Sequence, residues 1–180
     1  MKTKPQGFIL KADGVSFLTP EFRVSFPRIF EADDNGKFGC SMIFDRDTDF
    51  SVLEKAIADK EKEVWPKGAP KRDYLLPILD GDESNREEHK DKFYINGKAG
   101  KYRPGLVDAQ LAPIVDESEF YPGCWARAVI TLYHWVYSGK CGISVNIRNI
   151  QKIRDDEPLI SRTSAEDEFE AVSDAAVSDL

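Results

Sequence analysis

The clearest alternation of side chains along the chain lies in residues 125–137. A β-strand points successive side chains to opposite faces, so this segment separates into two rows. One row is small and mostly aliphatic: Ala126, Ala128, Ile130, Leu132, His134 and Val136. The other carries four large rings and an arginine: Trp125, Arg127, Val129, Thr131, Tyr133, Trp135 and Tyr137. The pattern predicts one long strand with an interior face and an aromatic, cationic face.

Two strands are predicted before this segment. Residues 15–30 alternate, with interruptions at Pro20 and Pro27, where a sheet loses a backbone donor. Phe22, Val24 and Phe26 form one row of this strand, and Arg23 and Ser25 form the other. The sequence Asp-Asp-Asn-Gly at 33–36 then indicates a turn, and residues 37–44 alternate again. These segments predict an antiparallel pair, preceded by a loose arm of about a dozen residues.

A helix and a second long strand complete the predicted elements. Phe50, Leu53, Ile57 and Val64 recur at helical spacing, after possible capping residues at 47–49 and before Pro66. Residues 69–91 are expected to form a surface excursion, 92–95 a short strand, and 96–105 a flexible basic loop. After a hairpin loop at 138–140, residues 141–153 alternate with aliphatic residues facing inward, namely Ile143, Val145 and Ile147.

The fold class predicted from these elements is mainly β. At about 3.3 Å per residue, a thirteen-residue strand spans about 40 Å and must coil or bend. Such a strand can serve both halves of a small closed barrel. We therefore predict an oligonucleotide/oligosaccharide-binding (OB) antiparallel barrel with one main helix and long loop excursions. The predicted domain covers residues 1–160, followed by a flexible acidic tail at 161–180.

Charge is distributed unevenly along the 180 residues. The formal net charge is −7, but no Lys or Arg follows Arg162. Six acidic residues lie in the tail: Glu166, Asp167, Glu168, Glu170, Asp174 and Asp179. Without these six, the body has 26 acidic residues against 25 basic ones. A nearly neutral body permits a local basic groove, because binding to phosphates depends on nearby charge.

Other classes of protein find less support in the sequence. No apolar run approaches the roughly 20 residues of a membrane span, so we expect a soluble intracellular protein. The three cysteines lack Cys-x-x-Cys spacing, which favours buried apolar residues over a disulfide framework or a zinc site. Four residues follow calcium-loop spacing, but Asn85 replaces the glycine that this loop needs: Asp80, Asp82, Ser84 and Asp91. A solvated acidic loop is the simpler interpretation, and we predict neither a metal nor a cofactor.

Cations interleaved with aromatic rings are the main candidates for binding chemistry. Such a surface can hold single-stranded nucleic acid, because rings stack on bases while cations meet phosphates. The candidate phosphate contacts are Lys98, Lys101, Arg103 and Arg127, and the candidate stacking rings are Tyr102, Tyr133 and Trp135. The alternative is that the strand rings belong to the core and that the basic stretch is an ordinary hairpin loop.

Several ordered segments resemble a family of phage single-stranded DNA-binding proteins that was long catalogued as a domain of unknown function. The segments lie at residues 93–96, 103–108, 118–124, 145–152 and 164–167, and the resemblance covers about residues 15–169. It implies an OB fold, sequence-independent binding of single-stranded DNA, and a role in phage replication or recombination in the cytoplasm of the infected bacterium. Acidic tails in similar proteins commonly finish with an aromatic residue, whereas this chain finishes with Leu180.

The expected function is therefore a non-enzymatic protein that coats and protects single-stranded DNA. Its acidic tail would compete with DNA for the groove and could recruit replication proteins. Two alternatives remain open. One is a protein-interaction or virion module without DNA binding. The other is a metal-dependent nuclease that would use Asp80, Asp82 and Glu83. Oligomeric state is not indicated by the sequence.

Overall fold

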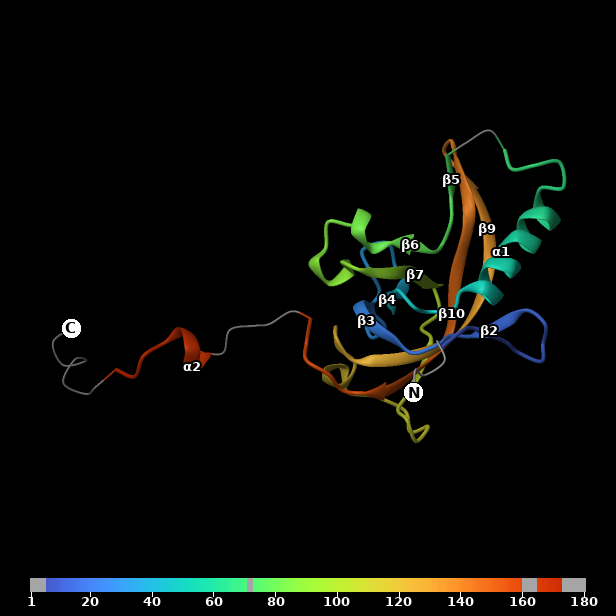
Figure 1. The fold of residues 1–180 in the computed structure, drawn as a ribbon. Coiled ribbons are helices and arrows are strands. Elements are labelled where there is room, and N and C mark those ends of the chain that lie inside the picture. Colours follow the sequence, from blue (N-terminus) through green and yellow to red (C-terminus); the bar gives the residue numbers. More distant parts are fainter. Residues whose placement is uncertain (1–5, 71–72, 160–164, 173–180) are drawn as a thin grey trace.

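The computed structural model describes residues 6–70, 73–159 and 165–172, and its strands form one sheet that closes into a barrel (Figure 1). The strands are β1 (Ile9–Leu10), β2 (Ser16–Leu18), β3 (Phe22–Arg28), β4 (Phe38–Asp45), β5 (Asp73–Leu75), β6 (Leu79–Asp80), β7 (Lys92–Gly100), β8 (Gly105–Val107), β9 (Trp125–Tyr137) and β10 (Lys140–Arg154). The helices are α1 (Ser51–Val64) and α2 (Ala165–Glu168), with 3₁₀ turns η1 (Gly81–Glu83), η2 (Glu87–His89) and η3 (Glu117–Glu119).

Five strands close the barrel in the order β9-β3-β4-β7-β10 and back to β9. All these pairings are antiparallel except β7 with β10, which is parallel. This is the five-stranded closed arrangement of an OB fold, so the predicted fold class is confirmed. The predicted pair of residues 15–30 and 37–44 is present as β3 and β4, and residues 19–21 separate β2 from β3.

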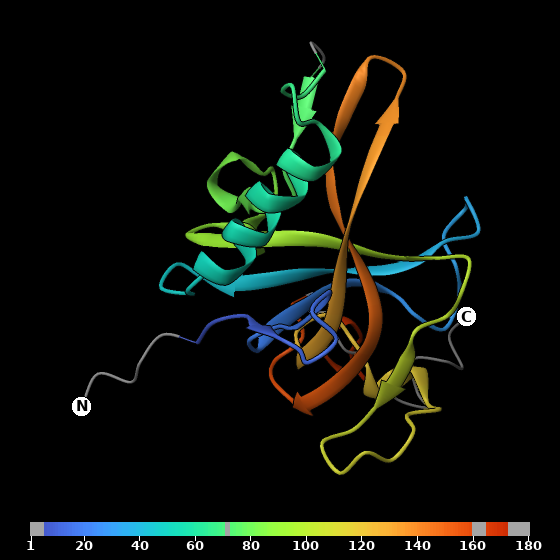
Figure 2. The same ribbon diagram turned by 90° about the vertical axis from the view of Figure 1, so that its right-hand side faces the viewer.

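The long strand β9 has the predicted bounds, and its two rows behave differently along its length. Ala126, Ala128 and Ile130 are buried in the barrel. His134 and Val136, which belong to the same row, are exposed, so their predicted interior position is wrong. The physical reason is that the β9–β10 hairpin extends beyond the rest of the barrel, where no opposing strand covers it (Figure 2).

The core joins α1 and the N-terminal segment to the barrel. Phe50, Leu53 and Ile57 of the predicted helix are buried, and the carboxylate of Asp49 accepts a hydrogen bond from the backbone N–H of Ser51 at 2.9 Å. Phe8 is also buried, with its ring centroid 5.5 Å from that of Phe44. Phe8 therefore anchors the expected loose arm to the core, while Ile9 and Leu10 beside it stay exposed. The three cysteines are free and buried, as predicted: Cys40, Cys124 and Cys141.

Residues 69–91 are more structured than the expected surface excursion. Within them, β5 pairs in parallel with β10, and β6 pairs antiparallel with the first half of β7. His89 is buried and stacks on the Tyr94 ring of β7, with centroids 4.1 Å apart. The turn-forming residues of this segment therefore lie between short paired strands, and the segment is not a free loop.

The predicted flexible loop at 96–105 is also wrong in its first half, because β7 continues to Gly100. The glycine that suggested a loop serves strand packing. A Cβ atom on Gly97 would lie 2.5 Å from Cδ1 of Ile147, so any larger residue would force the buried Ile147 side chain to shift. Glycine at this point lets β7 approach β10 and close the barrel. The loop proper is limited to residues 101–104.

The C-terminal segment is described only at residues 165–172, where α2 is followed by an exposed Phe169. Asp174 and Asp179 of the predicted tail lie outside the described residues, as do the side chains of Glu166 and Asp167. The predicted boundary at residue 160 and the flexibility of the tail therefore stay predictions. Within the described part of the chain, no helix is long and apolar enough to span a membrane.

Candidate nucleic-acid interface

Two adjoining hollows cross the outer surface of the barrel and share Lys37 and Lys98. We call them together the basic groove. The first hollow measures about 220 Å³, and its lining includes Phe26, Arg28, Asp33, Lys37, Phe38, Ser41, Asn96 and Lys98. The second measures about 480 Å³ and is lined by Lys37, Lys98, Gly100, Thr131, Tyr133 and Asn146. The groove therefore runs from β3 across β4 and β7 to the β9–β10 hairpin.

Lys98 occupies the central position of the groove. It is paired with Gly39 of β4 on one side and with Asn146 of β10 on the other, where β7 passes between the two strands. Because Gly39 has no side chain, β4 approaches β7 closely here: a Cβ atom on Gly39 would lie 2.4 Å from the carbonyl oxygen of Gly97. The neighbouring polar side chains bond to each other: the Ser41 hydroxyl donates to the Asn96 side-chain oxygen at 2.6 Å. The exposed Lys98 ammonium thus projects from a rigid sheet.

Lys37 is positioned by the turn between β3 and β4. The Asp33 carboxylate accepts hydrogen bonds from the backbone N–H groups of Asn35 at 2.9 Å and Lys37 at 3.0 Å. These bonds, led by that from Lys37, hold the pKa of Asp33 below its ordinary value of 3.8, and Lys37 and Lys98 add attraction. Asp33 is the single acid in the lining, against Arg28, Lys37 and Lys98. The groove consequently carries a positive excess.

The hairpin contributes an aromatic wall to the second hollow. Tyr133 is half-buried and lines this hollow together with Thr131, two residues earlier in the same row. Trp135 continues the row, and its indole N–H donates to the Ser144 hydroxyl at 2.9 Å across the hairpin. A ring held in this way has a fixed plane. Both rings keep part of their surface exposed, so the structure does not bury them in the core.

The other predicted site residues lie at different distances from the groove. Lys101 and Tyr102 lie in the turn after β7, next to the groove residue Gly100, and Tyr102 is 85% exposed. Arg103 places its guanidinium 4.5 Å from the centre of the Phe30 ring, in the loop that also holds Lys37. Arg127 is separate, because it donates to Gln151 at 2.7 Å in the barrel half of β9 and lines neither hollow.

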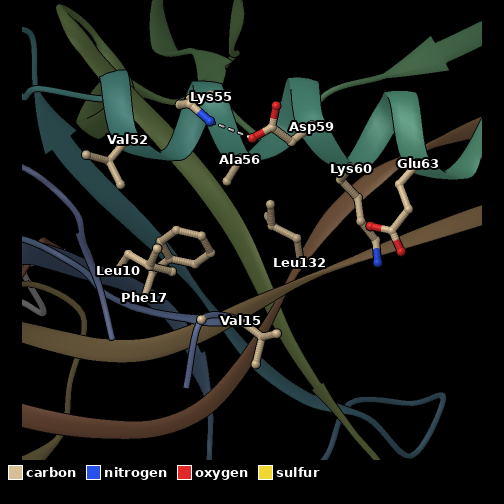
Figure 3. A pocket seen from close by; sticks show the side chains of 11 residues that line it. Leu10, Val15, Phe17, Val52, Lys55, Ala56, Asp59, Lys60, Glu63 and Leu132 are labelled. Carbon is tan, nitrogen blue, oxygen red and sulfur yellow. Dashed lines mark hydrogen bonds and ion pairs between the residues drawn. The ribbon is translucent and has the colours of Figure 1, made fainter. Parts of the chain in front are cut away.

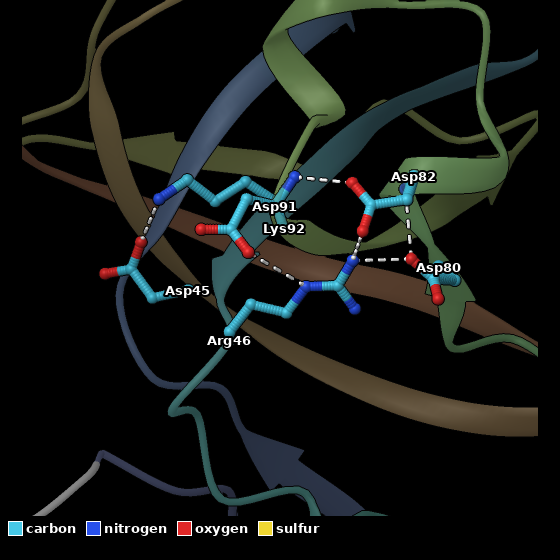
Figure 4. A network of polar contacts seen from close by, with 6 residues as sticks. All are labelled: Asp45, Arg46, Asp80, Asp82, Asp91 and Lys92. Atoms are coloured by element: carbon cyan, nitrogen blue, oxygen red, sulfur yellow. Dashed lines mark hydrogen bonds and ion pairs between the residues drawn. The ribbon is translucent and has the colours of Figure 1, made fainter.

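The three aspartates of the calcium-loop pattern, Asp80, Asp82 and Asp91, surround the guanidinium of Arg46 (Figure 4). Nη2 of Arg46 lies 2.6 Å from Asp80 and 2.7 Å from Asp82, while its Nε lies 3.7 Å from Asp91. The hydrogen bond from Arg46 is the main cause that holds the pKa of Asp80 below its ordinary value. These carboxylates form ion pairs that fasten η1 to the end of β4. One oxygen of Asp80 and one of Asp82 accept hydrogen bonds from the guanidinium.

A separate hollow of about 340 Å³ lies between α1, the β1–β2 turn and β9 (Figure 3). Its floor is apolar, with Leu10, Val15, Phe17 and Leu132, and its rim along α1 carries charges of both signs. Lys55, for example, is paired with Asp59 at 2.8 Å. This hollow lacks the positive excess of the basic groove.

Several groove residues were not predicted from the sequence, namely Phe26, Arg28, Lys37, Asn96 and Asn146. Lys37 follows a strong turn signal between the first two barrel strands, and in OB folds this loop commonly contacts the ligand. That signal could have found it. Phe26 was placed in one row with Phe22 and Val24, and this is wrong: those two are buried and Phe26 is exposed, because the strand bulges between Ser25 and Arg28.

The closed barrel and its cationic, aromatic-lined groove define an oligonucleotide-binding protein of the OB class. The chain belongs to the family of the Enterobacter phage Enc34 ssDNA-binding protein, whose family model matches residues 15–179. The resemblance found in the sequence is therefore confirmed. No curated protein sequence matches the chain.

Solved phage proteins share the fold. The single-stranded DNA-binding protein from bacteriophage Enc34 is 23% identical with a TM-score of 0.70, covering 94% of this chain and 97% of its own. The same phage protein in complex with ssDNA gives a TM-score of 0.69 at 23% identity over 89% and 96% of the two chains. Gp2.5, the single-stranded DNA-binding protein of bacteriophage T7, gives 0.62 at 10% identity over 91% and 100%.

Proposed function

We propose that this protein binds single-stranded DNA independently of sequence, in the basic groove, and coats the strand during phage replication or recombination. The observation that carries the proposal is the continuity of the two hollows through Lys37 and Lys98. Membership of the Enc34 family supports it. The role is one of binding, without a catalytic step.

The groove supplies both interactions that a single strand needs. Lys37, Lys98 and Arg28 line it and would neutralise phosphates, which releases counterions and makes affinity depend on salt. Tyr133 would stack on a base, and stacking tolerates any sequence because every base has a π-face. Ser41 and Asn96 already pair with each other, so they are not required to read base edges.

Residues next to the groove extend the proposed path. Lys101, Tyr102 and Arg103 lie directly after the strand that carries Lys98, and their exposure leaves them available to the same strand of DNA. Trp135 would offer a second stacking ring beyond Tyr133. Arg127, tied to Gln151 outside the groove, is at most a peripheral phosphate contact and the proposal does not depend on it.

The acidic tail supplies regulation in this proposal. Its carboxylates would compete with phosphates for Lys37 and Lys98 when DNA is absent, and DNA would release the tail for replication partners. The six acids after Arg162, with no cation among them, support this role.

The test is a titration of a poly-dT oligonucleotide, followed by tryptophan fluorescence at several salt concentrations. The full chain is compared with a chain truncated after Thr163. We expect quenching that weakens steeply with salt, and tighter binding after truncation. No binding by either folded form would refute the proposal and favour an interaction module. Equal binding by both forms would support DNA binding but refute competition between the tail and DNA.

The nuclease alternative has its own control. Single-stranded DNA is incubated with the protein and Mg²⁺ or Mn²⁺ and then sized on a gel. We expect the DNA to remain intact, because the Asp80 and Asp82 carboxylates are paired with the Arg46 guanidinium. Metal-dependent degradation that is lost in Asp80→Asn would contradict this expectation.

A further inference from the structure

Phe26 has an unusual backbone at the end of β3. Its φ is +48°, a left-handed conformation that bulky residues rarely adopt, and Pro27 follows it. At the same point β3 shifts register against β4, between Ser25 and Arg28. This register shift reverses which side chains face inward: Ser25 is buried, while Phe26 turns outward and is 37% exposed. Such strain persists where the surrounding structure holds it in place, often at functional sites.

The outward turn places the Phe26 ring in the first hollow of the basic groove, beside Arg28 and near Lys98. An exposed ring among cations is the arrangement on which single-stranded nucleic acid stacks. The second hollow already holds Tyr133 on the other side of Lys37 and Lys98. The groove therefore has an aromatic ring in each hollow, with the shared lysines between them.

Arg86 covers the Phe26 ring in this structure. Its guanidinium carbon lies 3.7 Å from the ring centroid, at the separation of stacked planes, so a base cannot enter between them. Among the residues that the structure describes, the Arg86 guanidinium has no hydrogen-bond or ion-pair partner. The backbone around it is fixed, because the neighbouring His89 is buried against Tyr94. The Arg86 side chain itself is exposed, so it can leave the ring without moving a buried neighbour.

We propose that Phe26 is a second base-stacking platform, and that Arg86 occupies it in place of a base when DNA is absent. This inference rests on the proposed function. An arriving base displaces the guanidinium, because base–aromatic stacking is stronger than an exposed cation–π contact. The released arginine keeps its charge next to the DNA and pairs with a phosphate of the strand that displaced it.

The two residues should leave different signatures in a titration of a labelled dT oligonucleotide over a series of salt concentrations. Phe26→Leu removes stacking but no charge, so binding should weaken about 5- to 150-fold at every salt concentration, with an unchanged salt slope. Arg86→Ala removes a phosphate contact, so the slope should become shallower by about 0.7. It also uncovers Phe26, so binding at the highest salt should be about 2- to 5-fold tighter than in the unmodified protein.

Two further variants separate binding from folding and from general charge effects. Phe26→Gly removes the ring and suits the positive φ, so it should remain folded and bind as weakly as Phe26→Leu. Arg154→Ala is the matched control, because Arg154 also lies over a ring, that of Trp125 at 4.6 Å, but this ring, unlike Phe26, lines neither hollow. It should bind like the unmodified protein.

Each possible result bears on one of the two proposals. Unmodified protein that fails to bind dT refutes the proposed function itself. Folded Phe26 variants that bind as tightly as the unmodified protein refute the platform alone. If Arg86→Ala binds more weakly at all salt concentrations, including the highest, then Arg86 does not compete with a base for Phe26 and acts only as a phosphate contact.

Discussion

Arg46 and Arg86 make the same ring contact but have opposite surroundings. The guanidinium carbon of Arg46 lies 4.3 Å from the centre of the Phe93 ring, and that of Arg86 lies 3.7 Å from the centre of Phe26. Asp80, Asp82 and Asp91 surround Arg46 (Figure 4). Arg86 has no such partner among the described residues. Both arginines therefore stack on a phenylalanine, and they differ in whether carboxylates neutralise the guanidinium charge.

The comparison shows how a nearly neutral protein can present a cationic surface. Where carboxylates meet a guanidinium, its charge is used inside the protein and fastens one segment to another. Where they are absent, the charge remains available to phosphates. The Arg46 cluster and the basic groove are thus two uses of the same residue types, and their separation can be tested by substitution.

The largest effect on DNA affinity is expected from reversing both shared lysines of the groove. Lys37→Glu combined with Lys98→Glu replaces two attractive charges with two repulsive ones, so affinity for a dT oligonucleotide at low salt should fall at least about 100-fold. Fluorescence titration measures it. Lys60→Glu with Lys62→Glu on α1 is the matched control for net charge and should change affinity much less. Equal losses in both double variants would contradict a localised groove.

A smaller effect is expected from removing the aromatic ring of the second hollow. Tyr133→Leu should weaken binding about 5- to 150-fold, because it loses stacking on one base, and the salt slope should not change. Tyr137→Leu, four residues further along the same row and 78% exposed, is the control and should bind normally. If Tyr133→Leu melts far below the unmodified protein by circular dichroism, Tyr133 is a core residue and its assignment to the groove fails.

Removing Arg46 should affect stability instead of binding. Arg46→Met preserves the stem over Phe93 but leaves the carboxylates of Asp80 and Asp82 facing each other without a cation. The melting temperature should fall by a few degrees, while the affinity of the folded protein for dT should be unchanged. A clear loss of affinity in Arg46→Met would mean that the acidic cluster also supports the groove.

The smallest effect is a pH dependence of that stability difference. Arg46 lowers the pKa of Asp80 from its ordinary value of 3.8, so the stabilisation is fully present above that value and is lost as the pH falls through the lowered folded pKa. The gap in melting temperature between the unmodified protein and Arg46→Met should therefore narrow below about pH 4. Melting curves from pH 7 to pH 3 test this, and a constant gap would contradict the assigned cause.

Much of the fold could be predicted because its elements carry strong periodic signals. The bounds of β9 match the alternation at 125–137, and the aliphatic residues of β10 face inward as predicted. The helix also follows from its spacing. Short strands such as β5 and β6 could not be predicted, because two or three residues form a strand only when a neighbouring strand such as β10 or β7 is already in place.

The groove was only partly predictable, for a different reason. Tyr133 was found because a strand row of rings suggests nucleic-acid binding, and Lys98 because it belongs to a basic stretch, although that stretch was predicted as a loop. Phe26 was missed because a bulge reverses the face of a single residue, and alternation alone cannot show a bulge. Arg86 was missed because its relevance depends on lying over Phe26, 60 positions earlier in the chain, a proximity that only the fold creates.

Closure of the barrel also sets the order in which the protein can fold. β3 pairs with β9 through Phe22 and Ala126, more than a hundred positions apart, and β7 finds its parallel partner only in β10. A ribosome therefore releases β3, β4 and β7 before β9 and β10 exist, as an open sheet in which β3 and the second half of β7 lack their partner strands. Contacts of such long range form slowly, and unpaired edges invite association with other chains. The time between synthesis of β7 and synthesis of β10 therefore sets how long these edges stay open to association with other chains.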